Sequence, residues 1–279
     1  MKKTIIEDIT DKRVSIFTEY NEAQLYHYFE PNGGVFIAET PNVISRALAR
    51  GCEPMAFLVE EKAYESQVVT ELLKEAEDAY VDFDSELEVF VARLEVINKI
   101  TGFNLTRGVL AVFKRPTLQQ VRDLLMSSNK VAILEDVMNP TNVGAIFRSA
   151  AALGVDAIFL THDSADPFYR RAARVAMGTS FQVPWTYFDK GSDYVSQLHS
   201  EGYKVVSMAL KENAIPLSAP ELKEHTKLAI IFGTESTGIK DETIAKSDYV
   251  TIIPMHHDVD SLNVAAASAV TFWELCGRG

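Results

Sequence analysis

The sequence has few cysteines, no long apolar run and no excess of basic residues. Its 279 residues include two cysteines, Cys52 and Cys276, which lie far apart and have no second pair of metal ligands nearby. We therefore expect two reduced thiols, with neither a disulfide framework nor a zinc site. No apolar run approaches the length that spans a membrane, and acidic residues follow Met1 too soon for a signal peptide. These absences predict a cytoplasmic protein without membrane contact.

The net charge of −12 argues against a general nucleic-acid coat. Sequence-independent affinity for phosphate comes from clustered lysine and arginine, and neither half of this chain is basic. Any contact with RNA must therefore come from local clusters. Arg170, Arg171 and Arg174 form one such cluster, in which Arg170 and Arg174 share a helix face by their i, i+4 spacing.

Two nucleotide-binding signatures are also missing. The segment 135–139, which follows the first apolar strand of the second half, lacks the G-x-G-x-x-G spacing of a dinucleotide site. A phosphate loop that ends in Gly-Lys-Ser/Thr is absent from the whole sequence. A nucleotide-like ligand would therefore have to be bound by later loops.

Strands and helices alternate regularly after Lys130. The apolar runs predict strands at 131–134, 157–160, 203–208, 228–232 and 250–253, with helices at 143–153, 167–177 and 193–201. Near-continuous apolar strands are typical of a parallel sheet that is covered on both faces. We therefore predict a doubly wound α/β domain, in which ligands bind beyond the carboxyl ends of the strands. Gly233 and Pro254 each follow such an end.

The first half predicts a smaller α/β domain. Strands are expected at 35–38, 55–59 and 108–113, with a further possible strand at 80–82. Helices are expected near the N-terminus, at 40–50, at 65–79 and from residue 85 to 100. This alternation predicts a small α/β sandwich with parallel pairing. The segment 114–117 has the composition of a linker, so we divide the chain into domains 1–115 and 116–279.

The C-terminal segment predicts a strand, a polar loop and a helix. Pro254 ends the strand, and Ser261 is the residue type that caps a helix, here one that runs on through Phe272. Asn263 would lie in the first turn, where two small polar side chains and free backbone amides face one cavity. A simple N-cap with an asparagine that faces solvent is the alternative.

Four segments occur in a telling order: Asn139–Ala150, Gly233–Gly238, Ile253–Met255 and Ser261–Val264. Together they resemble the motifs of the SpoU (TrmH-type) RNA 2'-O-ribose methyltransferases of the SPOUT superfamily, over roughly Val131–Glu274. The resemblance implies a parallel sheet with helices on both faces and a C-terminal trefoil knot, preceded by a ribosomal-protein-like α/β domain that recognises RNA. It also implies a homodimer through the catalytic domain. The apolar residues Val264, Ala267, Val270 and Phe272 suit such a contact, and they suit burial within one chain equally well.

The same resemblance implies transfer of a methyl group from S-adenosylmethionine to a ribose 2'-hydroxyl of structured RNA, either rRNA or tRNA, without a metal. The catalytic residues would be Asn142, Arg148, Glu235, Ser261 and Asn263. The cofactor would be held by Gly233, Ile253, Met255 and Leu262. RNA would be contacted by Arg148, Arg170 and Arg174. The sequence departs from the family pattern at Ser236, where a glycine is common.

Arginine stays protonated, so Arg148 is a poor base. We expect it to stabilise the forming alkoxide, while a phosphate or a water takes the proton. Plainer interpretations remain open: Arg148 in a surface ion pair, Glu235 as a cap for a short helix near Asp241, and Arg170 and Arg174 on a solvated face. For the whole protein, the alternatives are a non-catalytic RNA-binding or ribosome-assembly factor on the same fold, or a doubly wound small-molecule enzyme.

Overall fold

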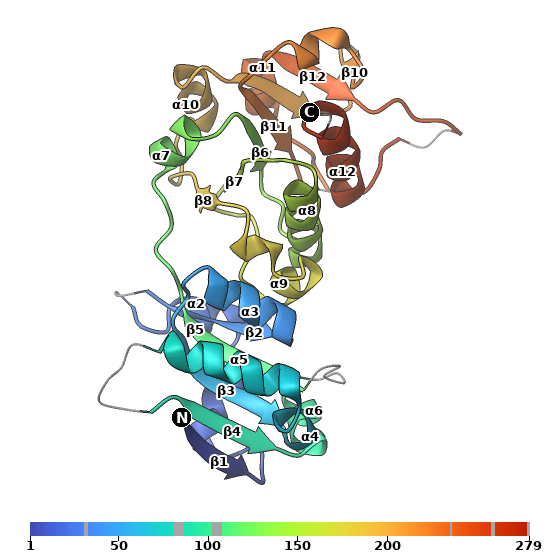
Figure 1. Cartoon of the computed structure of the whole chain (residues 1–279). Helices are drawn as coiled ribbons and strands as arrows, with labels where there is room; N and C mark the ends of the chain where they lie inside the picture. The colour runs from blue at the N-terminus through green and yellow to red at the C-terminus, as the bar shows by residue number, and fades with distance from the viewer. Residues whose placement is uncertain (31–32, 81–85, 102–107, 235, 258–259, 278–279) are drawn as a thin grey trace. The chain divides into compact units, whose positions relative to one another are not determined.

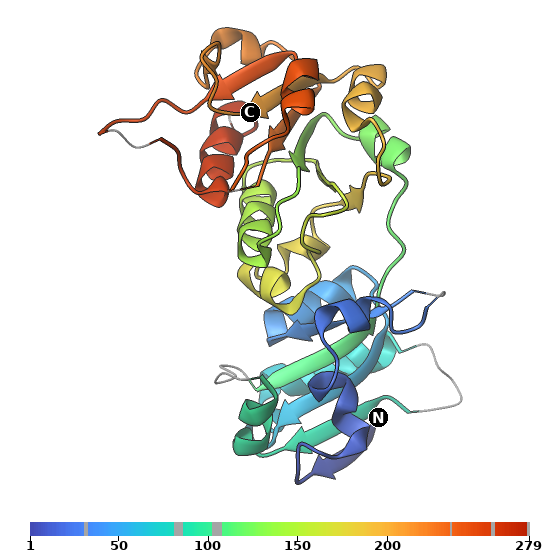
Figure 2. The ribbon, with the colours of Figure 1, turned by 180° about the vertical axis from the view of Figure 1, so that it is seen from behind.

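The computed structural model of the chain describes residues 1–30, 33–80, 86–101, 108–234, 236–257 and 260–277 (Figures 1 and 2). The chain forms two compact units. The first comprises Met1–Thr117 with Phe168–Phe181, and the second comprises Leu118–Pro167 with Gln182–Gly279. The functions predicted for 1–115 and 116–279 stay predictions.

The second unit is built on a seven-stranded sheet in the order β10-β12-β9-β11-β6-β7-β8. The strands are β6 (Lys130–Leu134), β7 (Ala157–Leu160), β8 (Trp185–Tyr187), β9 (Lys204–Met208), β10 (Ile215–Pro216), β11 (Leu228–Phe232) and β12 (Tyr249–Ile252). Every neighbouring pair is parallel. The predicted α/β fold with a parallel sheet is confirmed, and the two short strands β8 and β10 were not predicted.

Helices cover both faces of this sheet, as expected. One face packs against α7 (Val121–Met126), α10 (Tyr194–Ser200) and α11 (Asp241–Lys246), and η3 (Pro220–Lys223) follows β10. On the other face, α8 (Pro140–Ala152) and α12 (Val264–Leu275) lie side by side (Figures 1 and 2). Both faces are therefore closed to solvent along most of their length.

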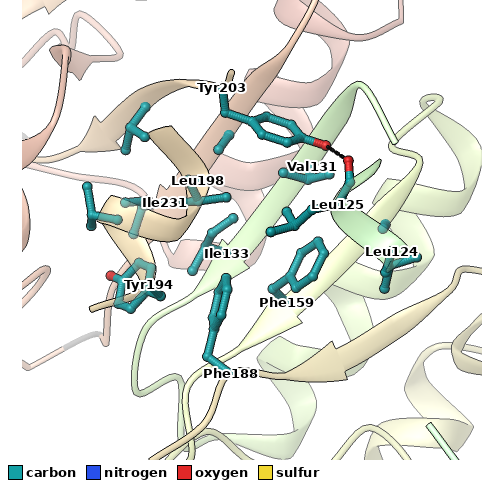
Figure 3. Close-up of a cluster of buried hydrophobic side chains, with 14 of the residues drawn as sticks. Leu124, Leu125, Val131, Ile133, Phe159, Phe188, Tyr194, Leu198, Tyr203 and Ile231 are labelled. Atoms are coloured by element: carbon teal, nitrogen blue, oxygen red, sulfur yellow. Dashed lines mark hydrogen bonds between the residues drawn. The ribbon is translucent and has the colours of Figure 1, made fainter. Parts of the chain in front are cut away.

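The core under α7 and α10 is a continuous cluster of apolar side chains (Figure 3). Val131 and Ile133 reach it from β6 at alternate positions, as the two-residue period of a strand requires. Tyr203 is buried there, and its hydroxyl donates to the carbonyl oxygens of Leu125 (2.9 Å) and Ser128 (2.7 Å). Burial raises the pKa of this phenol, so it stays a neutral donor.

The first unit has a five-stranded sheet in the order β1-β4-β3-β5-β2. Its strands are β1 (Lys2–Ile6), β2 (Val35–Glu39), β3 (Pro54–Glu60), β4 (Glu88–Ala92) and β5 (Val109–Lys114). Its helices are η1 (Lys12–Val14), α1 (Ser15–Thr18), α2 (Glu22–Tyr26), α3 (Pro41–Ala49), α4 (Glu61–Tyr64), α5 (Gln67–Asp78), α6 (Leu94–Thr101), α9 (Arg170–Val175) and η2 (Thr179–Phe181).

Two predictions for this unit were wrong. The pairing is mixed, because β5 runs antiparallel to both β2 and β3. The segment expected to be helical from residue 85 contains β4, whose Val89, Phe90 and Val91 favour a strand and are buried between β1 and β3. The helices predicted near the N-terminus are present as α1 and α2, and strand β1, which was not predicted, precedes them. The strand considered at 80–82 lies largely outside the described residues.

Helix α9 belongs to the first unit, where it contacts β2. Arg174 donates to Glu39 at 3.2 Å, and Arg170 lies 3.7 Å from Glu22 and 3.9 Å from Glu39. Glu39 is 4% exposed, and burial raises the pKa of its carboxyl although both arginines lower it. Both arginines are thus in ion pairs, and RNA contact by either stays a prediction.

Cys52 and Cys276 are both free thiols, as predicted. Burial raises the pKa of Cys52 to about 12 and that of Cys276 to about 11, so neither is a reactive thiolate at neutral pH. Among the described residues, no helix has the length and hydropathy of a membrane span, and no three His, Cys, Asp or Glu side chains gather as metal ligands.

Candidate active site

A cavity of about 840 Å³ lies at one edge of the seven-stranded sheet, within the second unit. The segments that follow β9, β11 and β12 form its walls, together with residues 260–264 and the first turn of α12. Because β12, β9 and β11 are parallel neighbours, their carboxyl ends meet at this edge. The cavity therefore lies where the sequence placed the ligand site.

The structure brings most of the predicted site residues to this cavity. The residues that line it include all four predicted cofactor contacts, Gly233, Ile253, Met255 and Leu262, and two predicted catalytic residues, Ser261 and Asn263. Asn142 reaches the same place through a contact with Asn263, whereas Arg148 does not line the cavity of its own chain. Glu235 lies outside the described residues. The roles predicted for all of these residues stay predictions.

Sequence reasoning missed the wall formed by residues 208–211. Met208 ends β9, and Ala209, Leu210 and Lys211 continue from it into the cavity lining. The signal that could have found them is the rule that identified Gly233 and Pro254, because β9 is a parallel strand whose carboxyl end lies between those of β11 and β12. Lys211 pairs with Asp241 at 2.8 Å, and this hydrogen bond lowers the pKa of the Asp241 carboxyl.

Gly233 is required by the close approach of two backbone segments. A Cβ atom at this position would lie 2.3 Å from the carbonyl carbon of Gly238 and 2.4 Å from the amide nitrogen of Ile239. Gly238 itself has φ +71°, and its amide donates to the carbonyl oxygen of Thr234 at 3.0 Å. A glycine is therefore needed at this position because the chain's own backbone leaves no room for a side chain.

Asn263, and not Ser261, caps α12. The helix begins at Val264, and the Asn263 side chain accepts a hydrogen bond from the Ala265 amide at 2.9 Å. Ser261 is exposed, two residues before the cap, so its predicted capping role was wrong. Asparagine caps a helix as well as serine does, and here its longer side chain does so while its Nδ2 donates to Asn142 Oδ1 at 3.3 Å. The cap thereby links α12 to α8.

Arg148 lies on α8 and is exposed. Within the described part of the chain its guanidinium makes no hydrogen bond or ion pair, unlike Arg170 and Arg174. Asn142, on the first turns of the same helix, is 7% exposed. The helix thus presents a free cation to solvent, while its buried amide contacts the cap of α12.

The cavity fits a ligand with an apolar body and scattered polar groups. Phe232, Ile252 and Leu262 supply apolar surface, while the loops after β11 and β12 supply backbone amides and carbonyls. The hydroxyl of Thr251, a fully buried lining residue, has no hydrogen-bond partner within the described chain. Buried polar groups are nearly always paired, so this hydroxyl is an exception within β12, below the surface of the cavity.

Residues 129–273 match the model of the SpoU rRNA Methylase family. The chain belongs to this family. All four segments that resembled SpoU motifs lie within the matched residues, which confirms the family predicted from the sequence.

The chain is also similar to curated proteins and solved structures over most of its length. It is 32% identical to an uncharacterized tRNA/rRNA methyltransferase of Mycobacterium bovis, across 98% of this chain and 91% of the relative. It is 29% identical to a 23S rRNA (guanosine(2553)-2'-O)-methyltransferase of Bacillus subtilis, across 79% and 86%. An AdoMet-bound rRNA methyltransferase from Sinorhizobium meliloti shares the fold, with a TM-score of 0.79, 21% identity and coverage of 98% and 97%.

We predict that Gly233→Ala disrupts the cavity wall. The added methyl group overlaps backbone atoms that cannot turn away, so the substitution should cost about 3 kcal/mol or more. Gly191→Ala is the matched control, because Gly191 has φ +75° but nothing within 4 Å of its Cβ position. That change should cost about 1 kcal/mol from backbone strain alone. Urea unfolding measures both, and equal costs would contradict the close-approach explanation.

Asn263 variants should separate capping from the link to α8. Asn263→Ala loses the cap and should destabilise the start of α12 by about 1 kcal/mol, seen as faster hydrogen exchange of the first helical amides. Asn263→Ser keeps a capping oxygen but is too short to reach Asn142. We expect the serine variant to retain most of the protection of these amides. If both variants exchange equally fast, the bond to Asn142 matters more than the cap.

Proposed function

We propose that this chain is an S-adenosylmethionine-dependent methyltransferase that methylates a ribose 2'-hydroxyl of structured RNA, either rRNA or tRNA. The observation that carries the proposal is the match to the SpoU family over the part of the chain that forms the cavity. The named relatives of Bacillus subtilis and Borreliella burgdorferi are 2'-O-methyltransferases of rRNA and tRNA. The substrates of these relatives support an RNA substrate for this chain. We also propose that it acts in the cytoplasm.

The cavity would hold S-adenosylmethionine, which supplies a methyl group on a positively charged sulfur. Gly233, Ile253, Met255 and Leu262 would contact it. In the transfer, a bond forms between the ribose oxygen and the methyl carbon as the carbon–sulfur bond breaks, and the hydroxyl proton leaves. Such a displacement needs the two reactants in line, so rigid walls supply much of the rate.

Arg148 would act on the RNA. Its guanidinium, which has no partner among the described residues, can donate to a phosphate or to the ribose oxygen, and this favours the alkoxide as the proton departs. Asn142 and Asn263 hold each other and the start of α12, and so fix the part of the cavity lining formed by Asn263 and Val264. We retain Glu235 and Ser261 as predicted catalytic residues, and Arg170 and Arg174 as predicted RNA contacts.

We expect Arg148→Ala to reduce turnover at least about a hundredfold, since one stabilising donor is lost from the transition state. The dissociation constant for S-adenosylmethionine, measured by calorimetry, should stay unchanged. Arg148→Lys should recover little, because a point charge does not replace the planar fork of donors. Arg122→Ala, at an exposed arginine of the same unit, is the control and should keep full activity.

The substrate is identified by mapping ribose methylation in RNA from cells with and without the gene. One nucleotide that loses its methyl group, and regains it with the wild-type chain but not with Arg148→Ala, is the expected result. Binding of RNA without S-adenosylmethionine binding or ribose methylation would instead identify an RNA-binding or assembly factor.

We also propose the family's trefoil knot near α12, a ribosomal-protein-like RNA-recognition role for the first unit, and a homodimer. Support for the dimer comes from an apolar stripe along α12 and its lead-in, formed by Leu262 (38% exposed), Ala266, Val270 (41%) and Trp273 (53%). Of the interface residues predicted from sequence, Phe272 is buried within the chain. The stripe adjoins the cavity, because Leu262 lines both.

The dimer predicts that Val270→Asp yields a monomer with little activity, because a buried carboxylate opposes association. Val68→Asp is the matched control, since Val68 is an exposed helical valine of the first unit (59% exposed). Light scattering after size-exclusion chromatography should show a dimer for the wild type and the control. A wild-type monomer at working concentration would contradict the proposal.

A further inference from the structure

Glu135 is a buried carboxylate that the proposed chemistry leaves without a role. It follows β6 directly and is 1% exposed. Its Oε1 accepts from the backbone amide of Lys240 at 2.7 Å, and its Oε2 accepts from the Thr243 hydroxyl at 2.6 Å and from the Tyr194 hydroxyl. A carboxylate is costly to bury unless such donors surround it. Glu135 therefore ties the end of β6 to the start of α11 and to α10.

Asp136, the next residue, holds the same lysine by its side chain. Asp136 Oδ2 lies 2.8 Å from Lys240 Nζ. The backbone of Asp136 is in the left-handed region, at φ +55°, which is uncommon for a residue other than glycine. Thr161 fixes this conformation, because its hydroxyl accepts from the Asp136 amide at 2.8 Å and donates to Asp136 Oδ1 at 2.7 Å. Adjacent carboxylates thus hold Lys240 by both its main chain and its side chain.

The held residue is part of the cavity wall. Gly238, Ile239, Lys240 and Asp241 all line the cavity, whereas Glu135 and Asp136 do not. Ile239 packs in the core cluster, which holds it in place. Lys240 is the next residue of the wall, and its position depends on the two carboxylates. Both carboxylates therefore act on the cavity through Lys240, and Glu135 acts in addition through Thr243 of α11, the helix that carries the lining residues Asp241 and Ile244.

We propose that Glu135 and Asp136 are positioning residues that preorganise the 238–240 wall for S-adenosylmethionine. The inference rests on the proposed function and adds a determinant of cofactor affinity to it. A wall that is already in place when the ligand arrives costs no ordering on binding. Loosening it should therefore raise the dissociation constant, while turnover at saturating S-adenosylmethionine changes little.

Calorimetry with S-adenosylmethionine tests the pair. Glu135→Ala should raise the dissociation constant at least tenfold, and Glu135→Gln should restore it to within about threefold of wild type, since the amide oxygen still accepts from Lys240 and both hydroxyls can turn to accept from its NH₂ group. Asp136→Asn should raise it about threefold, because the exposed ion pair is weak and asparagine tolerates the left-handed backbone. Glu224→Gln, at an exposed carboxylate, is the control.

Turnover at saturating S-adenosylmethionine should remain within about threefold of wild type in each variant. A double-mutant cycle of Asp136→Asn and Lys240→Gln supplies a test that does not need Glu135→Ala to fold. The two changes together should weaken binding no more than either alone.

If Glu135→Ala and the variants of the double-mutant cycle keep the wild-type dissociation constant, the positioning role is wrong and the proposed function still stands. The same holds if these variants lose turnover while their affinity for S-adenosylmethionine is unchanged. A wild-type chain that does not bind S-adenosylmethionine would overturn both.

Discussion

Parallel pairing throughout the seven-stranded sheet is the constraint on which the site depends. Parallel strands cannot be joined by tight hairpins, so each connection must cross a face of the sheet and return to the same edge. The chain accordingly leaves the carboxyl ends of β9, β11 and β12 as neighbours, and the loops that follow them share one cavity. Residues from 208 to 267 meet there although no short sequence motif unites them.

Polar contacts and close backbone packing hold the segments around the cavity. Glu135 receives three hydrogen bonds, and Asn142 receives one from Asn263. At Gly233 the backbone approaches residues 238 and 239 more closely than any side chain would permit. These contacts join segments that lie far apart in the sequence, so the shape of the cavity depends on the folded chain as a whole.

A helix or strand could be predicted from the sequence when neighbouring residues in the chain decide its conformation. Continuous apolar runs such as those in β6 and β11 are typical of buried strands. Both strands were predicted almost at their observed bounds. We predicted a helix where β4 lies because its short apolar run is followed closely by α6. Its strand conformation depends on pairing with β1 and β3, which lie far away in the sequence. β10 has two residues and depends on β12 for its existence.

The same division holds for the site. Gly233, Ile253 and Met255 follow strand ends directly, so their convergence could be inferred from the sheet alone. The hydrogen bonds of Glu135 could not, because they join residues 59 and 105 or more positions apart. Ser261 and Asn263 are both residue types that cap helices. The residue that caps α12 is decided by the contact of Asn263 with Asn142 of α8, which the local sequence does not reveal.

A chain with a net negative charge can attract RNA only through local groups of basic side chains. Several basic side chains of this protein are paired with carboxylates, among them Lys204 with Asp248, Lys211 with Asp241 and Lys240 with Asp136. Such pairs contribute little counterion release when a phosphate approaches, so general affinity for RNA should be weak. Arg148 is different, because it is exposed and has no partner among the described residues. Recognition by this protein would then depend on how well an RNA structure fits exposed groups such as Arg148.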